Sequence, residues 1–191
     1  MFNKLKFTTL TSVLIFSTSW LANGQPSLVK TEEGFQLKAD LMAGQYADAT
    51  IQMQDFEEVT YVVQLHELAI NDDYPAGVNF KFANEENTFF ILLSFIKQPS
   101  VTDAVIMSTE FWLNDKKLGE DIAAISEITD LGHLSLTVKW SLDRLDFTLN
   151  ESTNFHLNTP IPITKTSYSM QSSSGIIDAK THAKSKDNRS E

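Results

Sequence analysis

Apolar and polar residues alternate along most of the stretch 35–150, with a period of two. Val59, Tyr61, Val63 and Leu65 line up on one side of such a segment, with polar residues between them. Successive side chains of a β-strand point to opposite faces, so this alternation predicts strands with one buried face. The stretch therefore predicts a protein built mainly from β-strands.

Turn-forming residues separate the alternating segments into short strands. Residues 88–97 are apolar at almost every position, which predicts a central strand covered on both faces. Leu142, Asp143 and Arg144 interrupt the pattern between two alternating segments and predict a tight hairpin. We expect the other strands at residues 35–41, 51–53, 59–65, 78–82, 104–114, 134–140 and 145–149.

One segment departs from the period of two. Ile122, Ile125 and Ile128 recur every three residues after an acidic start, which predicts a short helix over Glu120–Thr129. Strands at intervals of about ten residues with one brief helix are typical of a β-sandwich. The expected fold class is all-β, a two-sheet antiparallel jelly-roll sandwich with at most one short helix.

The N-terminus has the three parts of a secretory signal peptide. Lys4 and Lys6 precede an apolar stretch within residues 10–21, and small residues stand before a cleavage point after Gly24. The apolar stretch is too short for a confident membrane span, and no later segment is long and apolar enough for one. We expect residues 1–24 to be removed and the protein to be secreted or periplasmic; an uncleaved N-terminal anchor is the alternative.

The remaining chain divides by composition into a domain and a tail. Residues 25–164 carry the alternating pattern and form the expected β-sandwich domain. Residues 165–191 are rich in Ser and Lys with few large apolar side chains, which predicts a disordered polar tail.

Charge and cysteine content restrict the partners. Residues 25–164 hold 22 acidic and 8 basic residues, a balance that would repel nucleic acid. The chain has no cysteine, so no disulfide stabilises it after export, and a short signal without cysteines is typical of a bacterial protein. Acidity alone fits a well-solvated surface or, as the sharper alternative, cation binding.

Residues 130–150, DLGHLSLTVKWSLDRLDFTLN, carry a family resemblance. A small turn with a His leads into a strand, a tight Asp-containing turn, and a second strand that ends in Asn. This arrangement resembles the late hairpin of concanavalin A-like lectin/glucanase domains, including laminin G-like modules, and the resemblance extends over roughly residues 35–160. It implies a lectin-like jelly roll that binds carbohydrate.

The chain departs from the enzymes of that superfamily. The resemblance implies carboxylates at alternating positions of one strand, yet Glu57 and Glu58 are adjacent and would point to opposite faces. Four scattered histidines without cysteine offer no zinc site, and no Gly-x-Ser-x-Gly turn is present. No catalytic residue is predicted.

Trp112 is the main candidate for ligand binding. Ser108, Glu110 and Asn114 lie on its side of the expected strand 104–114, whereas the other side is apolar. A tryptophan among polar residues can stack on a sugar ring while its neighbours bind the hydroxyls. A tryptophan packed beneath a loop is the structural alternative.

Asn71, Asp72 and Asp73 form the candidate metal site. Their oxygens are ligands that calcium prefers, although calcium needs six to eight oxygens from several segments. An Asx-rich turn before Tyr74 and Pro75 explains the same residues without a metal. Calcium is therefore the one candidate cofactor.

Three functions fit these observations. The favoured one is an exported non-catalytic module that recognises glycan or another extracellular surface through a sheet face. The alternatives are a diverged glycoside hydrolase or lyase and a structural or adhesive surface protein. An enzyme needs converging carboxylates, a lectin-like module needs an exposed aromatic with polar neighbours, and an adhesive subunit needs an apolar patch or an open strand edge.

Overall fold

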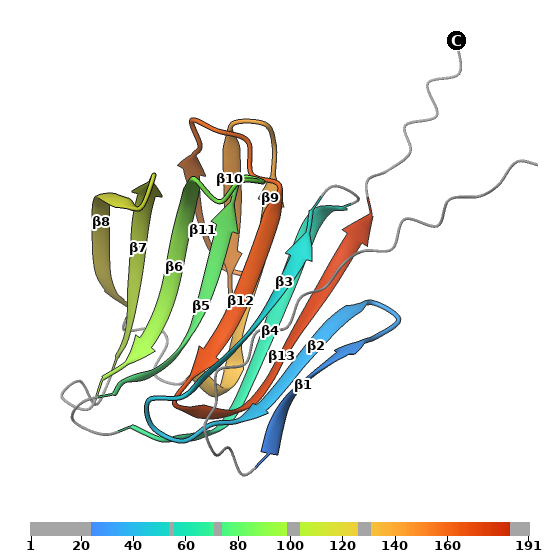
Figure 1. Ribbon diagram of the computed structural model, residues 1–191, viewed down its shortest axis with the longest axis vertical. Coiled ribbons are helices and arrows are strands. Elements are labelled where there is room, and N and C mark those ends of the chain that lie inside the picture. The colour runs from blue at the N-terminus through green and yellow to red at the C-terminus, as the bar shows by residue number, and fades with distance from the viewer. Residues whose placement is uncertain (1–23, 54–55, 71–73, 99–103, 126–130, 184–191) are drawn as a thin grey trace, which may run out of the picture.

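The protein folds as two antiparallel β-sheets packed face to face (Figure 1). The computed structural model describes residues 24–53, 56–70, 74–98, 104–125 and 131–183. The seven-stranded sheet has, in spatial order, β1 (Gly24–Lys30), β2 (Gly34–Asp40), β13 (Ser173–Ala183), β4 (Phe56–Leu68), β9 (Leu134–Trp140), β10 (Arg144–Leu149) and β11 (Thr153–Asn158). The six-stranded sheet has β3 (Tyr46–Gln52), β12 (Lys165–Gln171), β5 (Ala76–Ala83), β6 (Phe89–Lys97), β7 (Val105–Leu113) and β8 (Lys116–Ile125). The expected all-β sandwich is confirmed.

The core lies between the sheets and is filled by every second residue of the strands. Tyr61 on β4 is fully buried, with its ring centroid 4.7 Å from that of Phe80 and 5.4 Å from that of Tyr168. Its hydroxyl shares a 2.6 Å hydrogen bond with the hydroxyl of Thr166 on β12. Burial raises the pKa of Tyr61, so this phenol stays neutral and links the two sheets.

The strand and hairpin predictions are largely confirmed. β6 lies inside its sheet between β5 and β7, as the apolar segment 88–97 predicts. Its inward residues are buried, while Phe90 and Leu92 on the outer face remain half-buried. β9 and β10 form the expected antiparallel hairpin around residues 141–144.

The expected helix over Glu120–Thr129 is wrong for its described part. Residues 120–125 belong to β8, which pairs along β7 after a turn at Asn114 and Asp115. Both turn residues have positive φ, 48° and 62°, the conformation of tight hairpin turns that match the twist of a sheet. Pairing with β7 overrides the period of three, and residues 126–129 lie outside the described residues. The one helical element described is a 3-10 turn, η1 (Leu131–His133).

The disordered tail is the larger correction. Residues 165–183 form β12 and β13, and each strand has a hydrogen-bonded neighbour on both sides. Burial alternates along β12, with Thr166, Tyr168 and Met170 facing the core. The serines between them lie on the outer face, so a segment poor in large apolar residues still fills its inner positions. The domain therefore extends to residue 183, and the predicted boundary at residue 164 is wrong.

The predicted signal peptide remains a prediction. Residues 1–23, which hold nearly all of the predicted signal peptide, lie outside the described residues, as do residues 184–191. Gly24 is described and pairs with Asp40 at the start of β1. Within the described part of the chain, no helix has the length and apolar character that spanning a membrane requires.

The position of β12 and β13 predicts the effect of a truncation. A protein of residues 24–164 should show no cooperative thermal transition in circular dichroism, whereas residues 24–183 should unfold cooperatively. The shorter chain lacks the strands that hold β3 to β5 and β2 to β4. Cooperative unfolding of residues 24–164 would contradict this view of the sheet.

Candidate functional site

The residues around Trp112 lie on the outer face of the six-stranded sheet, the face turned away from the core. Three of the four predicted ligand-binding residues, Ser108, Glu110 and Trp112, project from β7 on this face. Trp112 is half-buried, and its indole Nε1 donates a 2.8 Å hydrogen bond to Oε2 of Glu110. Asn114 stands in the turn after β7, where its backbone N–H donates to the carbonyl of Thr88.

Lys117 and Glu120 on β8 complete this group, which we call the Trp112 cluster. Nζ of Lys117 lies 3.0 Å from Oε1 of Glu110 and 2.7 Å from Oε2 of Glu120. Ser108 donates a 3.4 Å hydrogen bond to Glu120. The bond from Lys117 holds the pKa of Glu120 below its ordinary value, so this carboxylate stays charged at neutral pH.

The Trp112 ring packs against a second aromatic ring on the neighbouring strand. Its centroid lies 5.6 Å from that of Phe90, and the two ring planes are 12° from parallel. Nζ of Lys81 lies 4.1 Å from the centre of the Phe90 ring. Because Phe90 covers part of Trp112 and Glu110 occupies its N–H, a sugar would find only part of the indole open. The role of the Trp112 residues in binding stays a prediction.

The predicted metal site cannot be placed in this structure. Asn71, Asp72 and Asp73 lie outside the described residues. Among the residues that are described, no group of three or more His, Asp or Glu side chains is arranged to hold a metal ion. Calcium binding stays a prediction.

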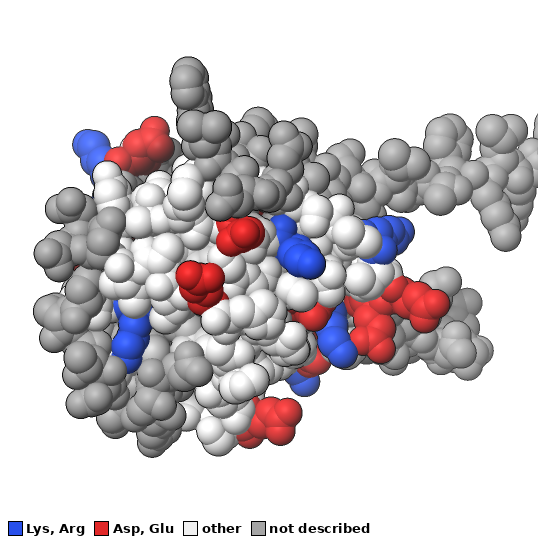
Figure 2. Space-filling view, turned by 90° about the horizontal axis from the view of Figure 1, so that it is seen from below, with Lys and Arg blue, Asp and Glu red and all other residues white. Residues whose placement is uncertain are grey.

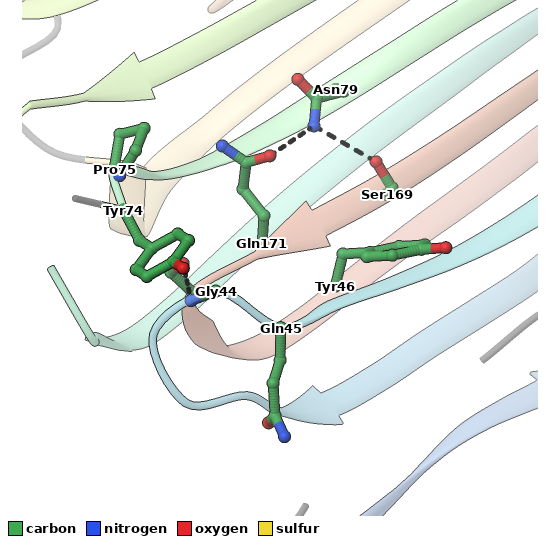
Figure 3. Close-up of a pocket in the computed structure, with 9 residues that line it drawn as sticks. Gly44, Gln45, Tyr46, Tyr74, Pro75, Asn79, Ser169 and Gln171 are labelled. Atoms are coloured by element: carbon green, nitrogen blue, oxygen red, sulfur yellow. Dashed lines mark hydrogen bonds between the residues drawn. The ribbon is translucent and has the colours of Figure 1, made fainter. Parts of the chain in front are cut away.

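The same outer face carries a hollow that sequence reasoning missed. Its volume is about 390 Å³, and it lies at the end of the sheet where β12 ends and β3 and β5 begin (Figure 3). We call it the tyrosine hollow, because Tyr46 and Tyr74 are its two aromatic residues and are 44% and 49% exposed. The other lining residues are Gly44, Gln45, Pro75, Asn79, Ser169, Gln171 and Ser172.

Polar side chains of two neighbouring strands form the part of the hollow between the tyrosines. Nδ2 of Asn79 on β5 donates to Oγ of Ser169 at 3.3 Å and to Oε1 of Gln171 at 3.5 Å, both on β12. Figure 3 shows these side chains between the Tyr74 ring on one side and Tyr46 on the other. The arrangement places amide and hydroxyl groups within reach of a ligand that contacts both aromatic rings.

Gly44 supports the Tyr74 side of the hollow. Its φ is +81°, in the left-handed region, and a Cβ built on it would lie 3.2 Å from the Tyr74 ring. Its backbone N–H donates a 3.0 Å hydrogen bond to Oγ of Ser172, the single residue between β12 and β13. This hydrogen bond holds the loop before β3 to the crossover between the sheets. The absence of a side chain at Gly44 leaves space for the Tyr74 ring.

Among the described residues that line the hollow, none is charged. Figure 2 views this end of the sandwich, where uncharged residues cover much of the surface and acidic and basic side chains stand among them. Apolar ring faces beside amides and hydroxyls, without a fixed charge, suit a ligand with many hydroxyl groups. No sequence signal marks the hollow before folding, because Tyr46, Tyr74 and Gln171 come from three distant segments.

Comparisons with known proteins support the fold. No protein-family model matches the chain, and no curated protein matches it. The structure resembles carbohydrate binding module CBM66 from Bacillus subtilis, with a TM-score of 0.52 at 10% identity, over 91% of this chain and 98% of that chain. It also resembles a single mutant of congerin II, with a TM-score of 0.50 at 8% identity, over 70% of this chain and 99% of that chain.

These similarities concern the fold, since the sequences have diverged almost completely. Both solved structures share the overall fold of this chain, and the expected two-sheet antiparallel sandwich is confirmed.

The support that Gly44 gives to Tyr74 predicts the effect of a single methyl group. Gly44→Ala should lower the free energy of unfolding by about 1–2 kcal/mol, because alanine is strained at positive φ and its Cβ meets the tyrosine ring. Urea unfolding measures the change. Gly119→Ala is the matched control, since no atom lies within 4 Å of its built Cβ, and it should change stability by less than about 0.5 kcal/mol.

The ion pairs of Lys117 predict a change in titration. Lys117→Met should raise the pKa of Glu120 towards its ordinary value, because the hydrogen bond that favours the carboxylate is lost. Titration of the Glu120 carboxyl carbon by NMR measures it. Lys139→Met removes a lysine that pairs with Glu58 instead and should leave Glu120 unchanged. An unaltered pKa of Glu120 in Lys117→Met would show that the ion pair between Lys117 and Glu120 does not persist in solution.

Proposed function

We propose that this protein is an exported, non-catalytic carbohydrate-binding module that binds glycan on the outer face of its six-stranded sheet. The tyrosine hollow is the primary site, and the Trp112 cluster extends the same face beyond Lys81 and Phe90. Cleavage after Gly24 would release the module and would remove one end residue of the edge strand β1.

The observation that carries the proposal is the composition of the hollow. Two half-exposed tyrosines stand beside Asn79, Ser169 and Gln171 in a recess of about 390 Å³ whose described lining residues are uncharged. Sugar rings present an apolar face and a rim of hydroxyls, and these two surfaces require an aromatic ring and hydrogen-bonding side chains respectively. CBM66, which is a carbohydrate binding module, supports the proposal by its similar fold.

The carboxylates of the Trp112 cluster do not suit glycoside hydrolysis. Glu110 and Glu120 are directly opposite each other on β7 and β8, as a carboxylate pair would need to be. A general acid requires a carboxyl group with a raised pKa, whereas Lys117 lowers that of Glu120. Binding is therefore the better-supported function for this face.

The test is a binding screen with matched variants. Residues 25–191 are titrated with neutral and acidic oligosaccharides, and binding is followed by the rise in melting temperature and by calorimetry. At least one oligosaccharide should bind, and Tyr46→Ala and Tyr74→Ala should each weaken it roughly tenfold or more, which corresponds to about 1.4 kcal/mol. Calcium and chelator arms of the same screen test the predicted cofactor.

Leu142→Ala is the control variant. Leu142 is 80% exposed in the β9–β10 turn, away from the hollow, so its loss should leave binding unchanged. Circular dichroism verifies that each variant is folded. Absence of binding across the panel would overturn the proposal and direct attention to β8, an edge strand on which Leu118 and Ile122 are 61% and 60% exposed.

A further inference from the structure

The lysines on the outer face of the six-stranded sheet differ in their partners. Lys117 on β8 lies between the carboxylates of Glu110 and Glu120. Lys81 on β5 and Lys165 on β12 have no ion pair with any carboxylate of the described residues. In a chain with 25 acidic and 15 basic residues, two lysines on one face that form no ion pair among the described residues need a physical explanation.

Lys81 and Lys165 are also close to each other. Lys81 pairs with Ser167 across the two strands, so Lys165 is its diagonal neighbour on the same face. Nζ of Lys165 donates a 2.8 Å hydrogen bond to the backbone carbonyl of Glu85, and Nζ of Lys81 lies over the Phe90 ring. Burial and then the charge of Lys165 lower the pKa of Lys81, and the charge of Asp115 offsets part of this effect.

The acidic side chains of this face stand away from Lys81. Asp48 is on β3 and Glu110 is on β7, and each of these strands is separated from β5 by one other strand. Asp115 in the β7–β8 turn acts on Lys81 through space but forms no ion pair with it. An anionic group at Lys81 would therefore meet a half-buried cation beside an aromatic ring, and no carboxylate of the described residues forms an ion pair with that cation.

Lys81 lies next to the tyrosine hollow. Asn79 of the hollow is two residues earlier on the same face of β5. The ammonium of Lys81 lies over the Phe90 ring, which is level with Ala83, four residues or roughly 14 Å beyond Asn79 along the strand. A glycan with one sugar between Tyr46 and Tyr74 therefore needs more than one further sugar to place a group at this ammonium.

We infer that the bound glycan is anionic, with one sugar in the tyrosine hollow and a carboxylate or sulfate ester of a sugar further along the chain at the ammonium of Lys81. This inference rests on the proposed function and adds the chemical class of the ligand. The ion pair would form in a half-buried setting, where charge-assisted hydrogen bonds are stronger than at an open surface. It would also relieve the repulsion between Lys81 and Lys165.

The experiment compares oligosaccharides that differ only in charge. Residues 25–191 are titrated by calorimetry with trigalacturonate and with the same trisaccharide whose carboxylates have been reduced to alcohols. A sulfated carrageenan oligosaccharide and its desulfated form make the second pair and distinguish carboxylate from sulfate. The charged member of one pair should bind at least roughly tenfold more tightly than its neutral form, as expected for a charge-assisted hydrogen bond.

Variants of Lys81 assign the effect to this residue. Lys81→Met should remove most of the preference for the charged member, and Lys81→Arg should retain most of it because the positive charge remains. Lys38→Met makes the same change in charge on an exposed residue of β2, in the other sheet, and should preserve the preference.

The outcomes distinguish this inference from the proposed function. Equal affinity for the charged and neutral members of a pair, with binding lost in Tyr46→Ala, would overturn the inference of an anionic ligand. The proposed carbohydrate binding in the tyrosine hollow would then still hold. A preference for charge that persists in Lys81→Met would also overturn the assignment to Lys81. Absence of binding by either pair and by every other glycan would overturn both.

Discussion

The pairing of β13 between β2 and β4 is the constraint on which the fold depends. The β1–β2 hairpin joins the seven-stranded sheet only through β13, and β3 joins the six-stranded sheet only through β12. The contact of β13 with β4 is close enough that a Cβ on Gly175 would collide with the carbonyl oxygen of Gln64. Two strands near the end of the described chain thus complete both sheets, and the sandwich is closed by pairings between residues more than a hundred positions apart.

The same constraint builds the tyrosine hollow. β12 lies between β3 and β5 and brings Ser169 and Gln171 beside Asn79, with Tyr46 at the start of β3. The crossover from β12 to β13 passes through Ser172, which has a φ of 47° and accepts a hydrogen bond from Gly44. Gly44 in turn leaves the space that Tyr74 occupies. The site is therefore a consequence of how the two sheets are joined.

Charge is distributed over the outer face in two different ways. In the Trp112 cluster, Lys117 pairs with two carboxylates, so its positive charge is engaged by neighbouring side chains. Around Lys81 and Lys165 the positive charge has no ion pair among the described residues, next to a hollow whose described lining residues are uncharged. This difference between the two parts of the face is the basis of the proposed anionic ligand, and it arises only when the strands are placed side by side.

The sequence by itself determined which segments become strands and which side chains share a face. Alternation identified β4 and the strands of the β9–β10 hairpin, and a continuous apolar run identified β6. Alternation also placed Trp112 with Ser108 and Glu110 on one face, because this relation is local to one strand. The sequence prediction was wrong for β8 and for β12–β13. The backbone hydrogen bonds of these strands are formed with partner strands, which the composition of the segments does not reveal. The hollow and the unpaired Lys81 could not be predicted for the same reason. Tyr46, Tyr74 and Gln171 meet only through strand pairings, and the counter-charges of a lysine depend on which strands become its neighbours.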